Sequence, residues 1–124
     1  MARILIAEDD RISQKLAVRI VEEQGHVALV SPHGKHAYET LMHNDIDMLL
    51  TDIMMPEMDG QQLIKTLRGD QKFANLPIII MSAVVGLNDI SNLLKLGATF
   101  FLAKPLDREE LLSYISRCLA EKDF

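Results

Sequence analysis

Residues 49–60 read LLTDIMMPEMDG, an apolar run that ends abruptly in a carboxylate, Asp52, and then in turn residues. An ionised carboxylate at the end of a buried strand is costly to desolvate unless a cation or hydrogen-bond donors contact it. We therefore expect the fold to bring polar side chains from distant segments of the chain to Asp52.

The composition is that of one ordinary globular domain. The chain has 124 residues, 48% of them hydrophobic and 25% charged, and no apolar run approaches the ~20 residues that a membrane span needs. A net charge of −5 argues against broad binding to nucleic acid or anionic lipid. The N-terminus has no secretory signal, so we expect a cytoplasmic protein. The single cysteine, Cys118, is expected in the core.

Strands and helices are expected to alternate along the whole chain. Short runs of branched apolar residues predict five strands that are covered on both faces. Apolar residues at helical spacing follow each of them and predict five helices. The expected strands are residues 4–7, 27–30, 48–51, 77–81 and 99–103.

Two of the helices carry specific expectations. The last one has a clear start signal, because Asp107 can accept hydrogen bonds from the first free backbone N–H groups. The first is expected to bury one face, whose residues recur at i, i+4, i+5, i+8 and i+9. These residues are Ile12, Leu16, Ala17, Ile20 and Val21.

Five such alternations predict a parallel sheet with right-handed crossovers and helices on both faces. All strands of such a sheet point the same way, so every strand-to-helix loop opens at one edge, where ligands of open α/β folds bind. Six polar residues should meet at that edge: Glu8, Asp9, Asp10, Asp52, Ser82 and Lys104.

Several carboxylates at one edge repel one another, and oxygen ligands without His or Cys suit Mg²⁺. A carboxylate beside Mg²⁺ can act as a nucleophile toward phosphorus, which makes Asp52 the candidate phosphoryl acceptor. Lys104 and Ser82 can neutralise and hydrogen-bond the phosphoryl oxygens.

These motifs give the chain a resemblance to the receiver domain of two-component response regulators, the CheY-like superfamily. The resemblance covers residues 1–124 as one domain and implies a flavodoxin-like, doubly wound sheet with strand order 2-1-3-4-5. It is carried by the acids at 8–10, Asp52 with Met55-Pro56 and Asp59-Gly60, Ser82-Ala83, and Lys104-Pro105.

The resemblance also implies a role for each site residue. Glu8 and Asp9 form the acidic pair, and the Mg²⁺ ligands are Asp9, Asp52 and the backbone carbonyl of Met54. Asp52 accepts the phosphoryl group from a phosphohistidine on a kinase or phosphotransfer protein. Ser82 and Phe101 are the switch residues, Lys104 pairs with the phosphoryl group, and the Lys104-Pro105 bond is cis.

Two departures from the family pattern bear on the behaviour of the switch. Phe101 stands where many relatives have tyrosine, so its rotation has to be driven by packing without a phenol hydrogen bond. Met54 and Val84 are apolar at positions that influence phosphoryl hydrolysis in receivers, and they cannot orient an attacking water. We therefore expect a fairly long-lived phosphorylated form.

Other functions are weighed against this one. The main alternative is a pseudo-receiver, a protein-interaction module that works without phosphorylation. A flavin-binding protein would need a hydroxyl- or glycine-rich phosphate loop after the first strand, where three acids stand here. An aspartate-dependent phosphohydrolase resembles proteins with an Asp-x-Asp nucleophile motif there, which Glu8-Asp9-Asp10 does not reproduce. We thus expect a signalling switch and not an enzyme.

The output side is expected from resemblance alone. The switch surface would lie on the fourth helix, fifth strand and fifth helix, about residues 87–119, and would contact a downstream protein or mediate a phosphorylation-dependent dimer. No nucleic acid or membrane is expected as a direct partner. The chain stops soon after the last expected helix, so it is either a stand-alone receiver, which Met1 favours, or a domain of a longer protein.

Overall fold

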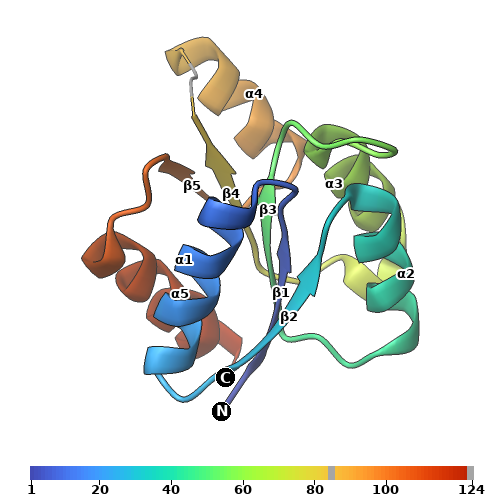
Figure 1. Ribbon diagram of the computed structural model, residues 1–124. Coiled ribbons are helices and arrows are strands. Elements are labelled where there is room, and N and C mark those ends of the chain that lie inside the picture. The colour runs from blue at the N-terminus through green and yellow to red at the C-terminus, as the bar shows by residue number, and fades with distance from the viewer. Residues whose placement is uncertain (84–85, 123–124) are drawn as a thin grey trace.

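The computed structural model describes residues 1–83 and 86–122, in which strands and helices alternate along the chain (Figure 1). The strands are β1 Arg3–Ala7, β2 Val27–Ser31, β3 Met48–Asp52, β4 Ile78–Ser82 and β5 Phe100–Ala103. The helices are α1 Arg11–Glu23, α2 Gly34–His43, α3 Gly60–Arg68, the short 3₁₀ helix η1 Gln71–Phe73, α4 Leu87–Leu96 and α5 Arg108–Lys122. Each predicted strand is found, with each end within one residue of its expected position.

The strands form one parallel sheet in the order β2-β1-β3-β4-β5, as predicted. The register explains how distant residues come together. Ala7 lies beside Thr51, so the next residue of each chain segment, Glu8 and Asp52, follows at the same edge. On the other side of β3, Asp52 itself lies beside Met81.

Helices cover both faces of the sheet, because successive side chains of a strand point to opposite faces. On β1, for example, Ile4 and Ile6 pack with α1 and α5, whereas Leu5 and Ala7 pack with α2, α3 and α4. Figure 1 shows the same layers, with α1 and α5 together on one side of the sheet. Cys118 of α5 is buried in the first of these two cores, as predicted.

The predicted inward face of α1 is only partly correct. Ala17, Ile20 and Val21 are buried, but Ile12 is 80% exposed and Leu16 is 36% exposed. The five predicted residues span about half of the helix circumference at ~100° per residue. The sheet and its neighbours cover only part of that arc, and the side that carries Ile12 and Leu16 remains at the surface.

The start signal of α5 is confirmed. The Asp107 carboxylate accepts hydrogen bonds from the backbone N–H groups of Glu109 at 2.9 Å and Glu110 at 3.3 Å. Within the described part of the chain, no helix is long and apolar enough to cross a lipid bilayer.

Arg68, the last residue of α3, joins three segments by hydrogen bonds. Its guanidinium donates to the carbonyl oxygens of Phe73 and Leu76, both at 2.6 Å, and of Gly97 at 2.9 Å. These acceptors belong to η1, to the approach to β4 and to the end of α4. Arg68 is partly buried, and this burial lowers its pKa. The carbonyl oxygens replace the water that its guanidinium loses there.

Arg68→Met should therefore lower the free energy of unfolding by about 2–4 kcal/mol, because it leaves several carbonyl groups without their charged donor. Urea denaturation followed by circular dichroism measures the change. Lys65→Met, an equal loss of charge on the exposed side of α3, is the control and should change the free energy by less than about 0.5 kcal/mol. Equal effects of the two substitutions would contradict the role of Arg68.

Candidate functional site: an acidic cluster at the carboxyl edge of the sheet

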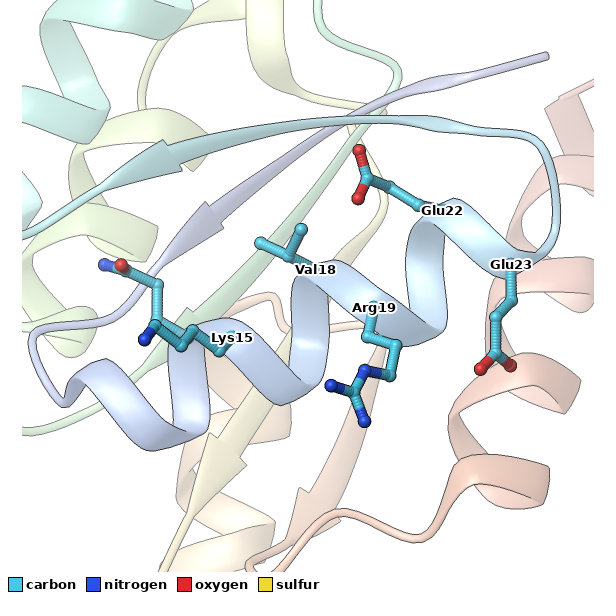
Figure 2. Close-up of a pocket in the computed structure, with 6 residues that line it drawn as sticks. Lys15, Val18, Arg19, Glu22 and Glu23 are labelled. Carbon is cyan, nitrogen blue, oxygen red and sulfur yellow. The ribbon is translucent and has the colours of Figure 1, made fainter.

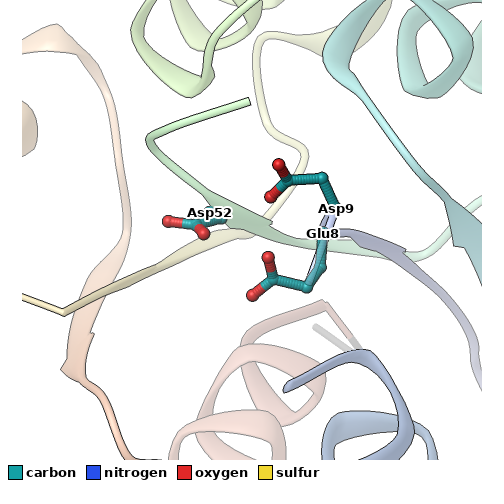
Figure 3. A group of neighbouring side chains, drawn as sticks. All are labelled: Glu8, Asp9 and Asp52. Carbon is teal, nitrogen blue, oxygen red and sulfur yellow. The ribbon is translucent and has the colours of Figure 1, made fainter. Parts of the chain in front are cut away.

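Three carboxylates gather where β1 and β3 end. Glu8 and Asp9 follow β1, Asp52 is the last residue of β3, and one ligand oxygen from each lies within 4.8 Å of the others. Figure 3 shows the three side chains directed into one space at this edge. Glu8 is fully buried and Asp52 is 7% exposed, while Asp9 is exposed to solvent. The cluster thus has two buried members and one that faces water.

Lys104 supplies the cation that the buried carboxylates require. Its ammonium donates hydrogen bonds to Glu8 Oε1 and, at 2.8 Å, to Asp52 Oδ2. Lys104 follows β5, and its backbone N–H donates to the carbonyl of Ser82 at 2.9 Å, which fixes it beside β4. The Lys104-Pro105 peptide bond is cis, as predicted.

The ionisable groups of Glu8 and Lys104 respond differently to burial. Burial raises the pKa of Glu8, and the Asp52 charge adds to this, although the bonds from Lys104 and from the Asp10 N–H oppose it. For Lys104, burial works against the charged form, but the bonds to Asp52 and Glu8 outweigh it and raise the pKa of the ammonium. The lysine therefore stays charged between its two carboxylate partners.

Backbone contacts hold Glu8 in place from two sides. Its N–H donates to the carbonyl of Ser31 at 2.9 Å, and the Gln14 side chain of α1 donates to its carbonyl at 2.8 Å. Sequence reasoning missed both residues. Ser31 could have been predicted from the pairing of β1 with β2. No local pattern marks Gln14, because its contact depends on how α1 packs against the segment that follows β1.

The loop between β3 and α3 packs directly on Asp52. Asp52 Oδ1 accepts a hydrogen bond from the Ile53 N–H at 2.6 Å, and the Gly60 N–H donates to the Ile53 carbonyl at 2.8 Å. A Cβ atom on Gly60 would lie 2.3 Å from the Asp52 carbonyl oxygen, closer than two such atoms can approach. This conformation of the loop therefore requires glycine at position 60, and the Asp59-Gly60 pair is the feature of the sequence that indicates it.

The remaining predicted site residues lie at the same edge with different contacts. Asp10 is the N-cap of α1 and accepts from the Ser13 N–H at 2.9 Å, a bond that lowers the pKa of its carboxyl group. It is therefore not a member of the cluster. Ser82 ends β4 and is buried, and Phe101 is half-buried against the core that faces α2, α3 and α4. Met54 is 76% exposed. Val84 lies outside the described residues.

A hollow of the surface lies along α1 (Figure 2). It presents two cations and two anions around Val18 and carries no nucleophile beside a base. Among the residues that the structure describes, the cluster of Glu8, Asp9 and Asp52 is the sole group of three His, Cys, Asp or Glu residues arranged to hold a metal ion. The lining residues of the hollow are Gln14, Lys15, Val18, Arg19, Glu22 and Glu23.

The donor set of the cluster fits a hard divalent cation. It consists of carboxylate oxygens with no nitrogen or sulfur donor, and Mg²⁺ prefers such oxygens while keeping several waters. The exposed position of Asp9 leaves room for those waters on the solvent side. The structure is thus that of a parallel α/β protein, with an acidic site at the carboxyl edge of its sheet that a lysine bridges.

Comparison with known proteins identifies the family. The profile described as response regulator receiver domain matches residues 4–116, and the chain belongs to this family. A chemotaxis protein CheY homolog of Campylobacter jejuni is 30% identical over 88% of this chain and 85% of its own length. Two other curated relatives, CrdR of Helicobacter pylori and NtrC of Proteus hauseri, are longer transcriptional regulators, of which the chain spans 54% and 24%. Receiver domains are signalling switches of two-component systems and interact with histidine kinases and downstream effectors.

Solved structures agree with this fold. The receiver domain of a Francisella response regulator superposes with a TM-score of 0.92 at 31% identity, covering 98% of this chain and 99% of that one. The receiver domain of a sensor histidine kinase from Pseudomonas aeruginosa has a TM-score of 0.88 at 26% identity, covering 96% and 98%. That structure has a magnesium ion coordinated in its active site cleft.

Gly60→Ala should lower the free energy of unfolding by about 1–3 kcal/mol, because the new methyl group has to push the β3–α3 loop away from Asp52. Urea denaturation measures this change. Gly69→Ala is the matched control, since its Cβ would meet no atom closer than 3.4 Å. A Gly60→Ala variant as stable as Gly69→Ala would show that the loop does not depend on the close approach.

Proposed function

We propose that residues 1–124 form a single phospho-acceptor receiver domain of a two-component phosphorelay. A phosphoryl group would pass, in the presence of Mg²⁺, from a phosphohistidine of a kinase or phosphotransfer protein to Asp52. The observation that carries this proposal is the position of Asp52, a nearly buried carboxylate beside Glu8 and Asp9 with the Lys104 ammonium bonded to it. Such a carboxylate is poised for charge-assisted chemistry at phosphorus.

The two oxygens of Asp52 have different partners and so different roles. Oδ1 is held by the N–H of the next residue, Ile53, whereas Oδ2 is held by the long side chain of Lys104. Oδ2 is therefore the oxygen that can form the new O–P bond while the P–N bond of the donor breaks. Lys104 is then beside the transferred group and can neutralise its oxygens.

The metal part of the proposal uses Asp9, Asp52 and the backbone carbonyl of Met54 as ligands, with Glu8 as the second member of the acidic pair. A divalent ion, when bound, supplies positive charge that offsets the carboxylates and the incoming phosphoryl oxygens. The donor chemistry of the cluster supports this assignment.

The switch part uses Ser82 and Phe101. Ser82 ends the strand beside β3, so its hydroxyl can reach a phosphoryl group on Asp52, and Phe101 lies one strand further. The half-buried position of Phe101 leaves it able to turn between the core and the surface. The surface of α4, β5 and α5 would then change its contact with a downstream protein or with a second copy of the chain.

The proposal describes a switch that assists its own phosphorylation and dephosphorylation and not an enzyme with a separate substrate. Its partners are proteins, with no direct contact to nucleic acid or membrane. We also propose a cytoplasmic location.

Acetyl phosphate with Mg²⁺ should add one phosphoryl group to the wild-type protein, detected by intact mass spectrometry. Asp52→Asn should fold as the wild type does and gain no phosphoryl group at this site. Asp45→Asn, which changes an exposed carboxylate before β3, should be labelled like the wild type. Undiminished labelling of Asp52→Asn would move the acceptor elsewhere. Absence of labelling in the wild type, also with a cognate donor, would favour the pseudo-receiver.

The phosphorylated form should persist for minutes or longer, because the exposed Met54 side chain offers no hydrogen bond to an attacking water. Met54→Asn supplies such a group and should shorten the lifetime several-fold. The loss of the phosphoryl mass over time in Mg²⁺ buffer measures both rates. Decay of the wild type within seconds would contradict this expectation.

A further inference from the structure

The strand β2 forms one edge of the sheet and pairs with β1 alone. Whereas β3 and β4 are buried along their whole length, four of the five residues of β2 are half-buried or exposed, and Val30 is 38% exposed. In Figure 1, β2 lies in view between α1 and α2. The described part of the chain thus leaves this edge open.

The open edge carries backbone groups that can still form hydrogen bonds. The N–H of Val27 and the carbonyl of Ser31 both bond to the segment of β1. In a parallel strand, the residues in between direct their N–H and C=O groups to the opposite side. The N–H and C=O groups of Ala28 and Val30 therefore face outward, where the described chain places no further strand.

The strand also lacks the features that keep an exposed edge from pairing. Natural proteins protect such edges with charged side chains, proline or a β-bulge. The sequence of β2 is VALVS, without a charge or a proline, and its register with β1 is continuous. An apolar edge strand of this kind is a template for pairing with another chain.

The hollow along α1 lies on the side of this helix that is next to β2. The opposite side of α1 faces α5, because Arg108 forms an ion pair with Glu23. Val18 lies about 140° around the helix from Glu23. Val18 lines the hollow and packs against the same core as Ala28 of β2. The hollow therefore continues the open edge on one face of the sheet.

Charges of opposite sign stand at the two ends of this hollow. Figure 2 shows Lys15 toward the start of α1 and Glu22 toward its end, with Val18 between them. Lys15 and Glu22 are exposed, and neither has an ion-pair partner among the described residues. A partner that fits the hollow needs the opposite order of charges.

A second copy of the chain has that order when it is turned about a two-fold axis perpendicular to the sheet. The two β2 strands then run antiparallel, and Ala28 of each copy bonds to Val30 of the other. The two α1 helices lie antiparallel on the same face. Because α1 covers β1 and β2 and strands are ~4.8 Å apart, the helix axes are about 10 Å apart, as in packed helices.

We propose that the β2 edge and the side of α1 that carries Lys15 and Glu22 form an interface between two copies of this chain. The surface is self-complementary, because the antiparallel arrangement places Lys15 of each copy beside Glu22 of the other. The interface contains no member of the acidic cluster and so forms without phosphorylation. It leaves β5, at the opposite edge of the sheet, free for another partner.

Sedimentation equilibrium of the unphosphorylated protein tests the interface. The wild type should have twice the mass of one chain and dissociate on dilution. Val30→Lys, at a position that is exposed in the single copy, should weaken the dimer about tenfold or more, because it places a charge on the pairing edge. Leu94→Lys makes the same change at a 42% exposed residue of α4 and should keep the wild-type affinity.

Charge reversal tests the antiparallel arrangement. Lys15→Glu and Glu22→Lys should each weaken self-association about tenfold, because each places like charges together at both ends of the interface. An equal mixture of the two variants should recover an affinity within about threefold of the wild type, since the mixed dimer restores both pairs of opposite charge. Lys65→Glu, on the exposed side of α3, is the matched control and should leave the affinity unchanged.

Amide hydrogen exchange detects the strand pairing without a substitution. The N–H groups of Ala28 and Val30 should exchange about tenfold more slowly in concentrated than in dilute protein. The N–H of Val27, which already bonds to β1, should change far less.

Several results would overturn the proposal. A wild type that stays monomeric throughout the dilution series would do so and would leave the edge to a strand of a different protein. A dimer that Leu94→Lys weakens and Val30→Lys does not would place the contact on α4. Charge variants that do not recover on mixing would exclude the antiparallel arrangement. None of these results bears on the phosphorylation of Asp52, which is measured separately by mass.

Discussion

The bridge from Lys104 to Glu8 and Asp52 is the interaction on which the carboxyl edge of the sheet depends. Two buried carboxylates side by side repel each other and lose their hydration, both of which destabilise the charged forms. The Lys104 ammonium offsets both effects, because it forms an ion pair with each carboxylate. The bridge also joins the ends of β1, β3 and β5, three segments that are far apart in sequence. The polar site is thereby part of the fold and not an addition to it.

The parallel sheet explains why these residues meet. Register places Glu8 and Asp52 one step beyond the paired residues Ala7 and Thr51, and the order of the strands places β4 and β5 on the far side of β3. Backbone bonds that involve Ser31, Asp10 and Ile53 then fix the two acids, while the Lys104 ammonium bonds to both of their side chains. The site thus combines carboxylates fixed by backbone donors with one cation on a long side chain.

Much of this could be predicted from the sequence, because strand periodicity and the acids after each strand report directly on a parallel sheet and its edge. Asp52 and Lys104 were found in this way. The prediction that Ile12 and Leu16 are buried is wrong. Helical spacing shows which residues share one face of a helix, but it does not show how much of that face neighbouring elements cover. Gln14 was missed because its contact with Glu8 depends on tertiary packing alone.

The central claim is that Asp52 carries the phosphoryl group, and the site of the bond can be read directly. Reduction of the phosphorylated protein with borohydride converts a phosphorylated aspartate to homoserine, and tandem mass spectrometry of the peptides then locates the change. We predict homoserine at position 52 after treatment with phosphodonor and Mg²⁺. Homoserine at another aspartate, with position 52 unchanged, would contradict it.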